Sequence, residues 1–200
     1  MLSLVQLLTT TLLLYTASSS PVSPRHGDDG PACPAKPPHG GKCWKDILAL
    51  EWKVHGFDYH ASYIFSTPAH QNSWGYVNFN LTNNVVPYTA TCSASSNQLS
   101  EFFFGTMEYP CTLPSTAPAG SAVSFKFSRP TGQLDIKETI ICNENKITGD
   151  FVASGAKNLT LTCTNTYYQN PNWTIGQIYS DQEVKCTPVD VTIKPSQIVA

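Results

Sequence analysis

The histidines are the residues of this chain whose side chains suggest the most specific chemistry, the binding of a metal ion. His26 follows Arg25, so a cleavage between them would leave an amino-terminal histidine. Such a histidine, paired with a second one, can hold copper, which favours imidazole and amine nitrogen ligands. That site would belong to a copper-dependent secreted oxidase. Because one arginine is a poor cleavage signal and His26 lies with His39 in a Pro- and Gly-rich segment, we favour solvated histidines over a metal site.

Three further histidines lie in or near predicted strands. His55 and His60 are five residues apart across Gly56, and His70 lies in a predicted loop. In a continuous strand an odd spacing puts two side chains on opposite faces, so joint metal binding would need a bulge. Exposed strand histidines are therefore the favoured interpretation.

Carboxylates give no catalytic pattern. Asp46 with Glu51 or Asp58 is the nearest approach to a carboxylate pair, and the spacing does not indicate a glycosidase. Asp135 and Glu138 have the character of solvated strand positions. The sequence also contains no zinc-protease, nucleophile-elbow, phosphate-loop or Cys-x-x-Cys motif.

Aromatic side chains are the other candidate site. Three consecutive Phe, 102 to 104, cannot all point inward in a strand, so Phe103 is expected to point outward, opposite to its neighbours. An outward ring is either covered by another segment or subunit, or part of an exposed patch for a partner or a small aromatic ligand. Exposed Trp74 and Tyr76 would suit sugar stacking in a cell-wall carbohydrate-binding module.

The elements that position these residues are strands. Apolar and polar residues alternate from Leu50 to Phe65, around residues 77–81, and through most of 88–136, which is typical of strands with one buried face. Gly56 suits a bulge or bend, and Arg129–Gly132 suits a hairpin turn. Residues 43–50 have room for one short helical turn. The sequence therefore predicts an all-β fold, a compact antiparallel β-barrel or β-sandwich.

The chain divides by composition into four segments. Residues 1–19 are uncharged and apolar and end in small residues, which predicts a cleaved signal peptide. Residues 20–42 are rich in Pro, Gly and Ser and predict a flexible extension. We assign the folded domain to residues 43–165, and residues 166–200 to a C-terminal extension in which 189–193 would add an edge strand.

Composition limits the partners. With a net charge of -2 and 13% charged residues, the chain has no basic footprint for nucleic acid and no polybasic membrane patch. Sequons begin at Asn80, Asn158 and Asn172, which predicts a glycosylated, secreted protein. Seven cysteines fit an oxidising compartment. The odd number leaves at least one cysteine unpaired or bonded to another chain.

One ordered set of motifs is specific enough to compare with a known family. Cys92-Ser-Ala is followed by Leu99, by Cys111, and by Phe-x-Phe-x-Arg-x-x-Gly-x-Leu-x-Ile ending at Ile136. With Trp52 upstream and two cysteines downstream, this order resembles the secreted β-barrel family of filamentous fungi typified by the major allergen of the mould Alternaria, which includes elicitors of plant defence. The resemblance covers roughly residues 52–163.

The resemblance also implies a disulfide pattern. It pairs Cys92 with Cys111 and Cys142 with Cys163, each closing a loop of about 20 residues that stabilises by roughly 3 kcal/mol. Family dimers are joined through a cysteine just before the first strand, and Cys43 lies nearest to that place. Cys33 and Cys186 are extra relative to the family pattern; if Cys43 paired with Cys186, Cys33 would be the odd thiol, free or interchain.

The resemblance implies function as well as fold. We expect a secreted, non-enzymatic binding protein, allergen- or elicitor-like, without a cofactor, that recognises plant defence proteins or small flavonoid-type ligands and forms a homodimer. The carbohydrate-binding module and the copper-dependent oxidase are the alternatives.

Overall fold

The computed structural model of the chain describes residues 42–144 and 147–200. The expected signal peptide, His26, Cys33 and all but the last residue of the expected flexible extension lie outside the described residues. In the part of the chain that the structure describes, no helix is both long enough and apolar enough to cross a membrane.

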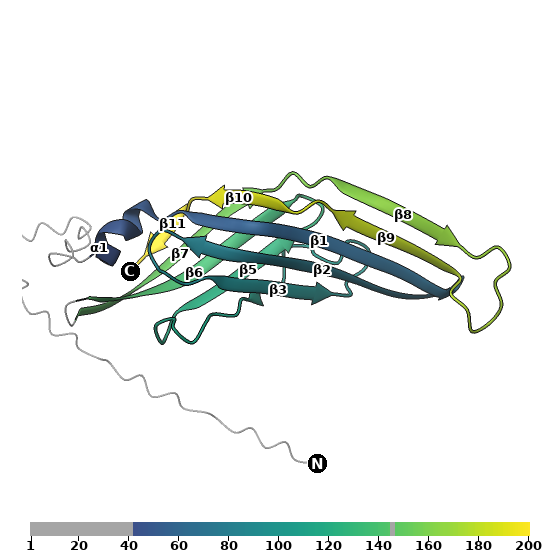
Figure 1. The fold of residues 1–200 in the computed structure, drawn as a ribbon, viewed down its shortest axis with the longest axis horizontal. Helices are drawn as coiled ribbons and strands as arrows, with labels where there is room; N and C mark the ends of the chain where they lie inside the picture. Colours follow the sequence, from purple (N-terminus) through teal and green to yellow (C-terminus); the bar gives the residue numbers. More distant parts are fainter. Residues whose placement is uncertain (1–41, 145–146) are drawn as a thin grey trace, which may run out of the picture. The chain divides into compact units, whose positions relative to one another are not determined.

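In the described residues, eleven antiparallel strands form two sheets (Figure 1). The first, sheet A, has the order β3-β2-β1-β9-β8, with β10 also paired to β1; the second, sheet B, has the order β11-β7-β6-β5-β4. The strands are β1 Trp52–Thr67, β2 His70–Asn83, β3 Ala90–Ser96, β4 Tyr109–Pro110, β5 Ala122–Ser128, β6 Gln133–Glu144, β7 Ile147–Asn158, β8 Cys163–Gln169, β9 Ser180–Cys186, β10 Val189–Ile193 and β11 Gln197–Val199. The predicted all-β class is confirmed, in the form of a two-sheet sandwich.

Aromatic rings from both sheets meet in the core between them. Phe57 of β1 lies 5.0 Å, centroid to centroid, from Phe127 of β5, and Phe79 of β2 lies 5.0 Å from Phe125 of β5. All four rings are buried, and burying a Phe side chain stabilises a fold by about 1.5–3 kcal/mol. The core therefore holds the two sheets face to face and leaves the outer face of each for function.

Strand β1 bends at Gly56, as the sequence predicts. Its pairing with β2 and with β10 shifts register around this residue, and Gly56 has φ +61°. A bulge adds one residue to a strand and so reverses the face on which later side chains lie. The inward positions are therefore even-numbered before the bulge and odd-numbered after it, with Val54 and Phe57 both buried.

The predicted hairpin joins β5 to β6. Its glycine, Gly132, has φ +69°, and a Cβ there would lie 2.6 Å from the backbone oxygen of Leu159. Both the left-handed backbone and the close approach require glycine at this position.

A short helical segment precedes β1. It consists of α1, Lys42–Asp46, and a 3-10 turn, Ile47–Ala49, which matches the helical turn expected over residues 43–50. Ile47 and Leu50 are buried against the sandwich, so this segment is part of the core.

Three disulfides form among the cysteines that the structure describes, and they correct part of the expected pairing. Cys92 bonds to Cys111, as the family resemblance implies. Cys142 bonds to Cys43 instead of Cys163. The remaining pair is between Cys163 and Cys186, so the alternative pairing of Cys43 with Cys186 is also wrong. The reason is positional: Cys142 lies on β6 of sheet B, whereas Cys163 opens β8 of sheet A, directly opposite Cys186 of β9.

The residues that we set apart as a C-terminal extension contribute strands to both sheets. Strand β9 lies between β1 and β8 within sheet A, and β11 pairs with β7 in sheet B. Residues 189–193, the expected edge strand, form β10 and pair with β1.

Candidate functional site

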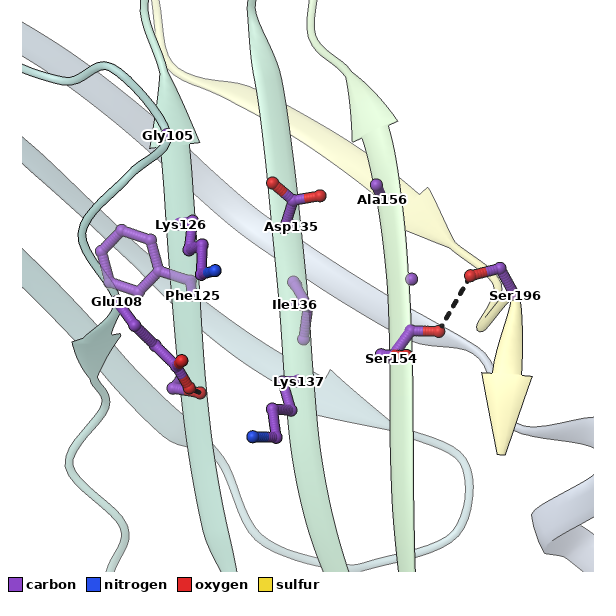
Figure 2. Close-up of a pocket in the computed structure, with 12 residues that line it drawn as sticks. Gly105, Glu108, Phe125, Lys126, Asp135, Ile136, Lys137, Ser154, Ala156 and Ser196 are labelled. Atoms are coloured by element: carbon purple, nitrogen blue, oxygen red, sulfur yellow. Dashed lines mark hydrogen bonds between the residues drawn. The ribbon is translucent and has the colours of Figure 1, made fainter. Parts of the chain in front are cut away.

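A groove lies on the outer face of sheet B. It has a volume of about 420 Å³, and Figure 2 shows that its floor runs across β5, β6 and β7. One side is formed by the loop from Gly105 to Glu108, and the other by Ser196, whose hydroxyl donates to the backbone oxygen of Ser154 at 3.2 Å. Volumes of this size are typical of small-molecule sites.

Small side chains make the floor hollow. Ser124 of β5, Lys137 of β6 and Ser154 of β7 form one row across the sheet, and Lys126, Asp135 and Ala156 form the next. Since Ser154 and Ala156 project little from the sheet, the space above them stays open. The floor is rigid because each of its strands is hydrogen-bonded on both sides.

Charges of both signs line the groove. The ammonium groups of Lys126 and Lys137 lie over the same sheet surface as the carboxylates of Asp135 and Glu108 (Figure 2). A hydrogen bond of 2.6 Å from the Ser124 hydroxyl lowers the pKa of Glu108, and the nearby charges of Lys137 and Lys126 lower it further. Glu108 is therefore ionised at neutral pH, and the groove offers two cations and two anions, a balance that suits a neutral ligand with several hydroxyl groups.

The outer face of sheet A carries a second feature, an aromatic pair on β2. The side chains of Trp74 and Tyr76 are 46% and 37% exposed and occupy consecutive outward positions of the strand. The Tyr76 ring stacks on the imidazole of His60 at 5.0 Å with an interplanar angle of 19°. The expectation that Trp74 and Tyr76 are exposed agrees with these fractions.

The prediction that Phe103 points outward is wrong. Phe103 is 1% exposed and packs between Tyr59, Tyr109 and Phe127, whereas Phe104 is 42% exposed. The expectation assumed a strand, but the three Phe residues lie in a loop where Phe102 has φ +66°. A loop need not alternate, so Phe102 and Phe103 both turn inward and Phe104 is the outward ring.

The histidines find separate partners. The bulge at Gly56 places both His55 and His60 on accessible positions, but His55 lies 2.9 Å from the hydroxyl of Thr82, and His60 lies 2.9 Å from the carboxylate of Asp58. His70 contacts the hydroxyl of Ser66 at 2.9 Å. Within residues 42–144 and 147–200, no group of three or more His, Cys, Asp and Glu side chains could hold a metal ion.

The sequon asparagines are all accessible. Asn80 lies on the outer face of β2, Asn158 ends β7, and Asn172 lies in the loop after β8; each is exposed. Their positions would accept a glycan without disturbing the core.

The expectation that Glu138 is a solvated strand position is wrong, because this carboxyl is buried. Glu138 of β6 lies in the core, where its carboxylate accepts hydrogen bonds from Trp52 Nε1 at 2.6 Å, from Asn83 Nδ2 at 2.9 Å and from the Tyr88 hydroxyl at 3.2 Å. Burial raises the pKa of Glu138, and these three hydrogen bonds oppose the rise. Strand parity was the available signal, because Glu138 shares its face with the buried Ile136 and Ile140. The hydrogen bonds from Trp52 of β1 and Asn83 of β2 to Glu138 of β6 link the two sheets, so they stabilise the fold.

Comparison with known proteins decides the family. The family model described as Alternaria alternata allergen 1 matches residues 54–186, from β1 to the end of β9. The chain belongs to this allergen family. No curated protein and no solved structure gave a significant match to the chain. The family match includes all of the groove except Ser196, and all of the aromatic pair, so both features lie in the part of the chain that the allergen family shares.

Proposed function

We propose that this allergen-family member is a secreted, non-enzymatic binding protein that acts at a host interface as an elicitor does. Three disulfides support an oxidising, extracellular compartment. Exposed sequon asparagines and the apolar residues 1–19 agree with passage through a secretory pathway. An intact bond between Arg25 and His26 in the secreted protein would exclude the copper oxidase alternative.

The groove on sheet B is the observation that carries the proposal. It combines a volume of about 420 Å³ with a rigid floor of paired strands and four charged side chains at its surface. Binding sites use a few well-placed polar groups to orient a ligand, and a pre-formed site loses little entropy when it binds.

We propose a small hydroxylated aromatic compound, such as a flavonol, as the ligand. Its flat ring would lie over the small side chains of Ser154 and Ala156. Its hydroxyl groups would donate to Asp135 and Glu108 and accept from Lys126 and Lys137, which satisfies both signs of charge. A plant defence protein remains the proposed macromolecular partner, and a homodimer the proposed assembly.

Calorimetric titration of a flavonol into the full secreted protein tests the proposal. Ala156→Phe should fill the groove and weaken binding about tenfold or more, because the ring would occupy the ligand's volume. Val152→Phe is the matched control, since Val152 lies on the same strand and outside the groove. An equal affinity for wild type and Ala156→Phe would contradict the groove as the site, and no measurable heat at any concentration would contradict the ligand class.

A further inference from the structure

We infer that the outer face of sheet A is a binding site for a β-linked polysaccharide built from glucose-type units, with Trp74 and Tyr76 as its stacking surface. We call this surface the aromatic strip and define it by Trp74, Tyr76, His60, Ser62, Glu183 and Lys185. It lies on the opposite sheet from the groove, so the inference goes beyond the proposed function and does not depend on it.

The two aromatic rings have the spacing and exposure that a sugar chain needs. Trp74 and Tyr76 are alternate residues of β2, so about 7 Å separates their Cα atoms along the strand. Both side chains are substantially exposed on one face. When all substituents of a pyranose ring are equatorial, as in glucose and N-acetylglucosamine, axial C–H groups cover both ring faces, and these pack against aromatic rings.

The Tyr76 ring is held in place before any ligand arrives. It stacks on His60, whose Nδ1 lies 2.9 Å from the carboxylate of Asp58. Beneath the strip, Gly75 packs so closely on Phe102 that a Cβ would lie 2.7 Å from that ring. A fixed ring loses little conformational entropy on binding, which favours recognition of a flexible sugar chain.

Polar side chains surround the rings in register. Ser62 lies directly across from Trp74, with Glu183 beyond it on β9. Tyr76 lies between Ser95 of β3 and His60 of β1. Lys185 of β9 lies on the far side of His60. The Lys185 ammonium pairs with the Glu183 carboxylate at 2.8 Å. Hydroxyl, carboxylate and ammonium groups beside stacking rings can hydrogen-bond to the equatorial hydroxyls of a sugar.

This composition favours a glycan over a protein. The centre of a protein interface is apolar, well packed and shut off from water by a surrounding ring of contacts. The cross-strand neighbours of Trp74 and Tyr76 are instead Ser62, Ser95 and His60, so polar side chains lie directly beside the two rings. A hydrated, hydroxyl-rich ligand matches such a surface.

The sequon at Asn80 lies on the same face of β2. Asn80 is four residues from Tyr76, about 13 Å along the strand, and is exposed. A glycan at Asn80 can therefore reach the strip and compete with an external sugar, so the binding experiment must be run with and without it.

Co-sedimentation with insoluble polysaccharides tests the inference. The full secreted protein, before and after enzymatic removal of N-glycans, is incubated with curdlan, a β-1,3-glucan, and separately with chitin, so that the two arms distinguish the source of the sugar. We expect retention on at least one polymer, with a gain on deglycosylation if the Asn80 glycan occupies the strip. Trp74→Ala should weaken retention about tenfold, and Tyr76→Ala by a smaller factor.

The matched control is Tyr167→Ala. Tyr167 is also an exposed aromatic residue of sheet A, but it lies on β8 outside the strip. Retention should stay within about twofold of wild type in this variant, and all variants are compared by thermal unfolding to confirm that they fold. No retention of either form on either polymer would overturn the inference, as would retention that Trp74→Ala and Tyr76→Ala leave unchanged. Loss of flavonol binding in Ala156→Phe with polysaccharide binding intact would separate this site from the groove.

Discussion

The indole N–H of Trp52 donates a 2.6 Å hydrogen bond to the buried carboxylate of Glu138, and this bond joins β1 of sheet A to β6 of sheet B. Asn83 and Tyr88 donate to the same carboxylate, so three donors from one side of the core converge on a single acidic group. A buried carboxylate that is hydrogen-bonded in this way fixes the position of β6, whose outer face forms the middle of the groove.

Glu138 should make the stability of the protein depend on pH. Burial raises the pKa of Glu138 in the folded state, so between the unfolded value, about 4.3, and the raised folded value the folded protein binds more protons than the unfolded chain. Its contribution is therefore most favourable below the unfolded pKa and is lost as the pH rises through the folded pKa. Glu138→Gln cannot titrate and should lack this loss.

Urea unfolding from pH 4 to pH 7 measures the effect. The free energy of unfolding of wild type should fall relative to that of Glu138→Gln as the pH rises. Glu183→Gln, at an accessible carboxylate of β9, is the control and should follow the wild-type profile. Parallel profiles for wild type and Glu138→Gln would contradict the assignment of a raised pKa.

The disulfide between Cys43 and Cys142 should stabilise the fold most. It links residues 99 apart, whereas Cys163 and Cys186 are 23 apart. In the chain-entropy account, replacing both cysteines by Ser would cost about 5 kcal/mol for the first pair and about 3 kcal/mol for the second. The urea midpoints of the two double variants show which disulfide stabilises the fold more. A larger loss of stability in the Cys163 and Cys186 variant would contradict the prediction.

Phe103 and Phe104 should differ sharply as alanine variants. Phe103 is packed among Tyr59, Tyr109 and Phe127, so Phe103→Ala should lower the free energy of unfolding by about 3–5 kcal/mol. Phe104 is 42% exposed, so Phe104→Ala should lower the free energy of unfolding by about 1 kcal/mol or less. Equal losses, measured by denaturant unfolding, would restore the outward assignment of Phe103.

Gly75 and Phe102 should be energetically coupled. A Cβ at Gly75 would lie 2.7 Å from Phe102, so Gly75→Ala should destabilise the protein by about 1–3 kcal/mol through overpacking. The same substitution should cost less in a Phe102→Leu background, because the smaller side chain leaves room. A double-mutant cycle with zero interaction energy would contradict this coupling and would show that the added methyl group is accommodated by residues other than Phe102.

The strands could be predicted because their alternation is local. The bulge at Gly56, the hairpin ending at Gly132 and the pair Cys92–Cys111 also follow from residues close in sequence or from the family pattern. The partners of Cys142 and Cys163 could not be predicted, because they depend on which sheet each strand joins. Cys142 on β6 bonds to Cys43 of the first helix, 99 residues away, and Cys163 bonds across the β8–β9 pair to Cys186, which lies outside the segment that the resemblance covers.

The candidate sites were only partly predictable for the same reason. Trp74 and Tyr76 lie in a regular strand, where alternation determines the outward face. Phe103 lies in a loop, where it does not. The groove was not predicted at all, since its floor combines rows from β5, β6 and β7 and its edges come from residues 105–108 and Ser196.

Mapping of backbone amide NMR shifts during a flavonol titration tests the central claim most directly. If the groove is the binding site, the largest shift changes should fall on Lys126, Asp135, Ser154 and their neighbours in β5–β7, while Trp74 and Tyr76 of sheet A stay unchanged. Shift changes confined to sheet A, or none at saturating flavonol, would contradict the claim that the outer face of sheet B is the ligand site.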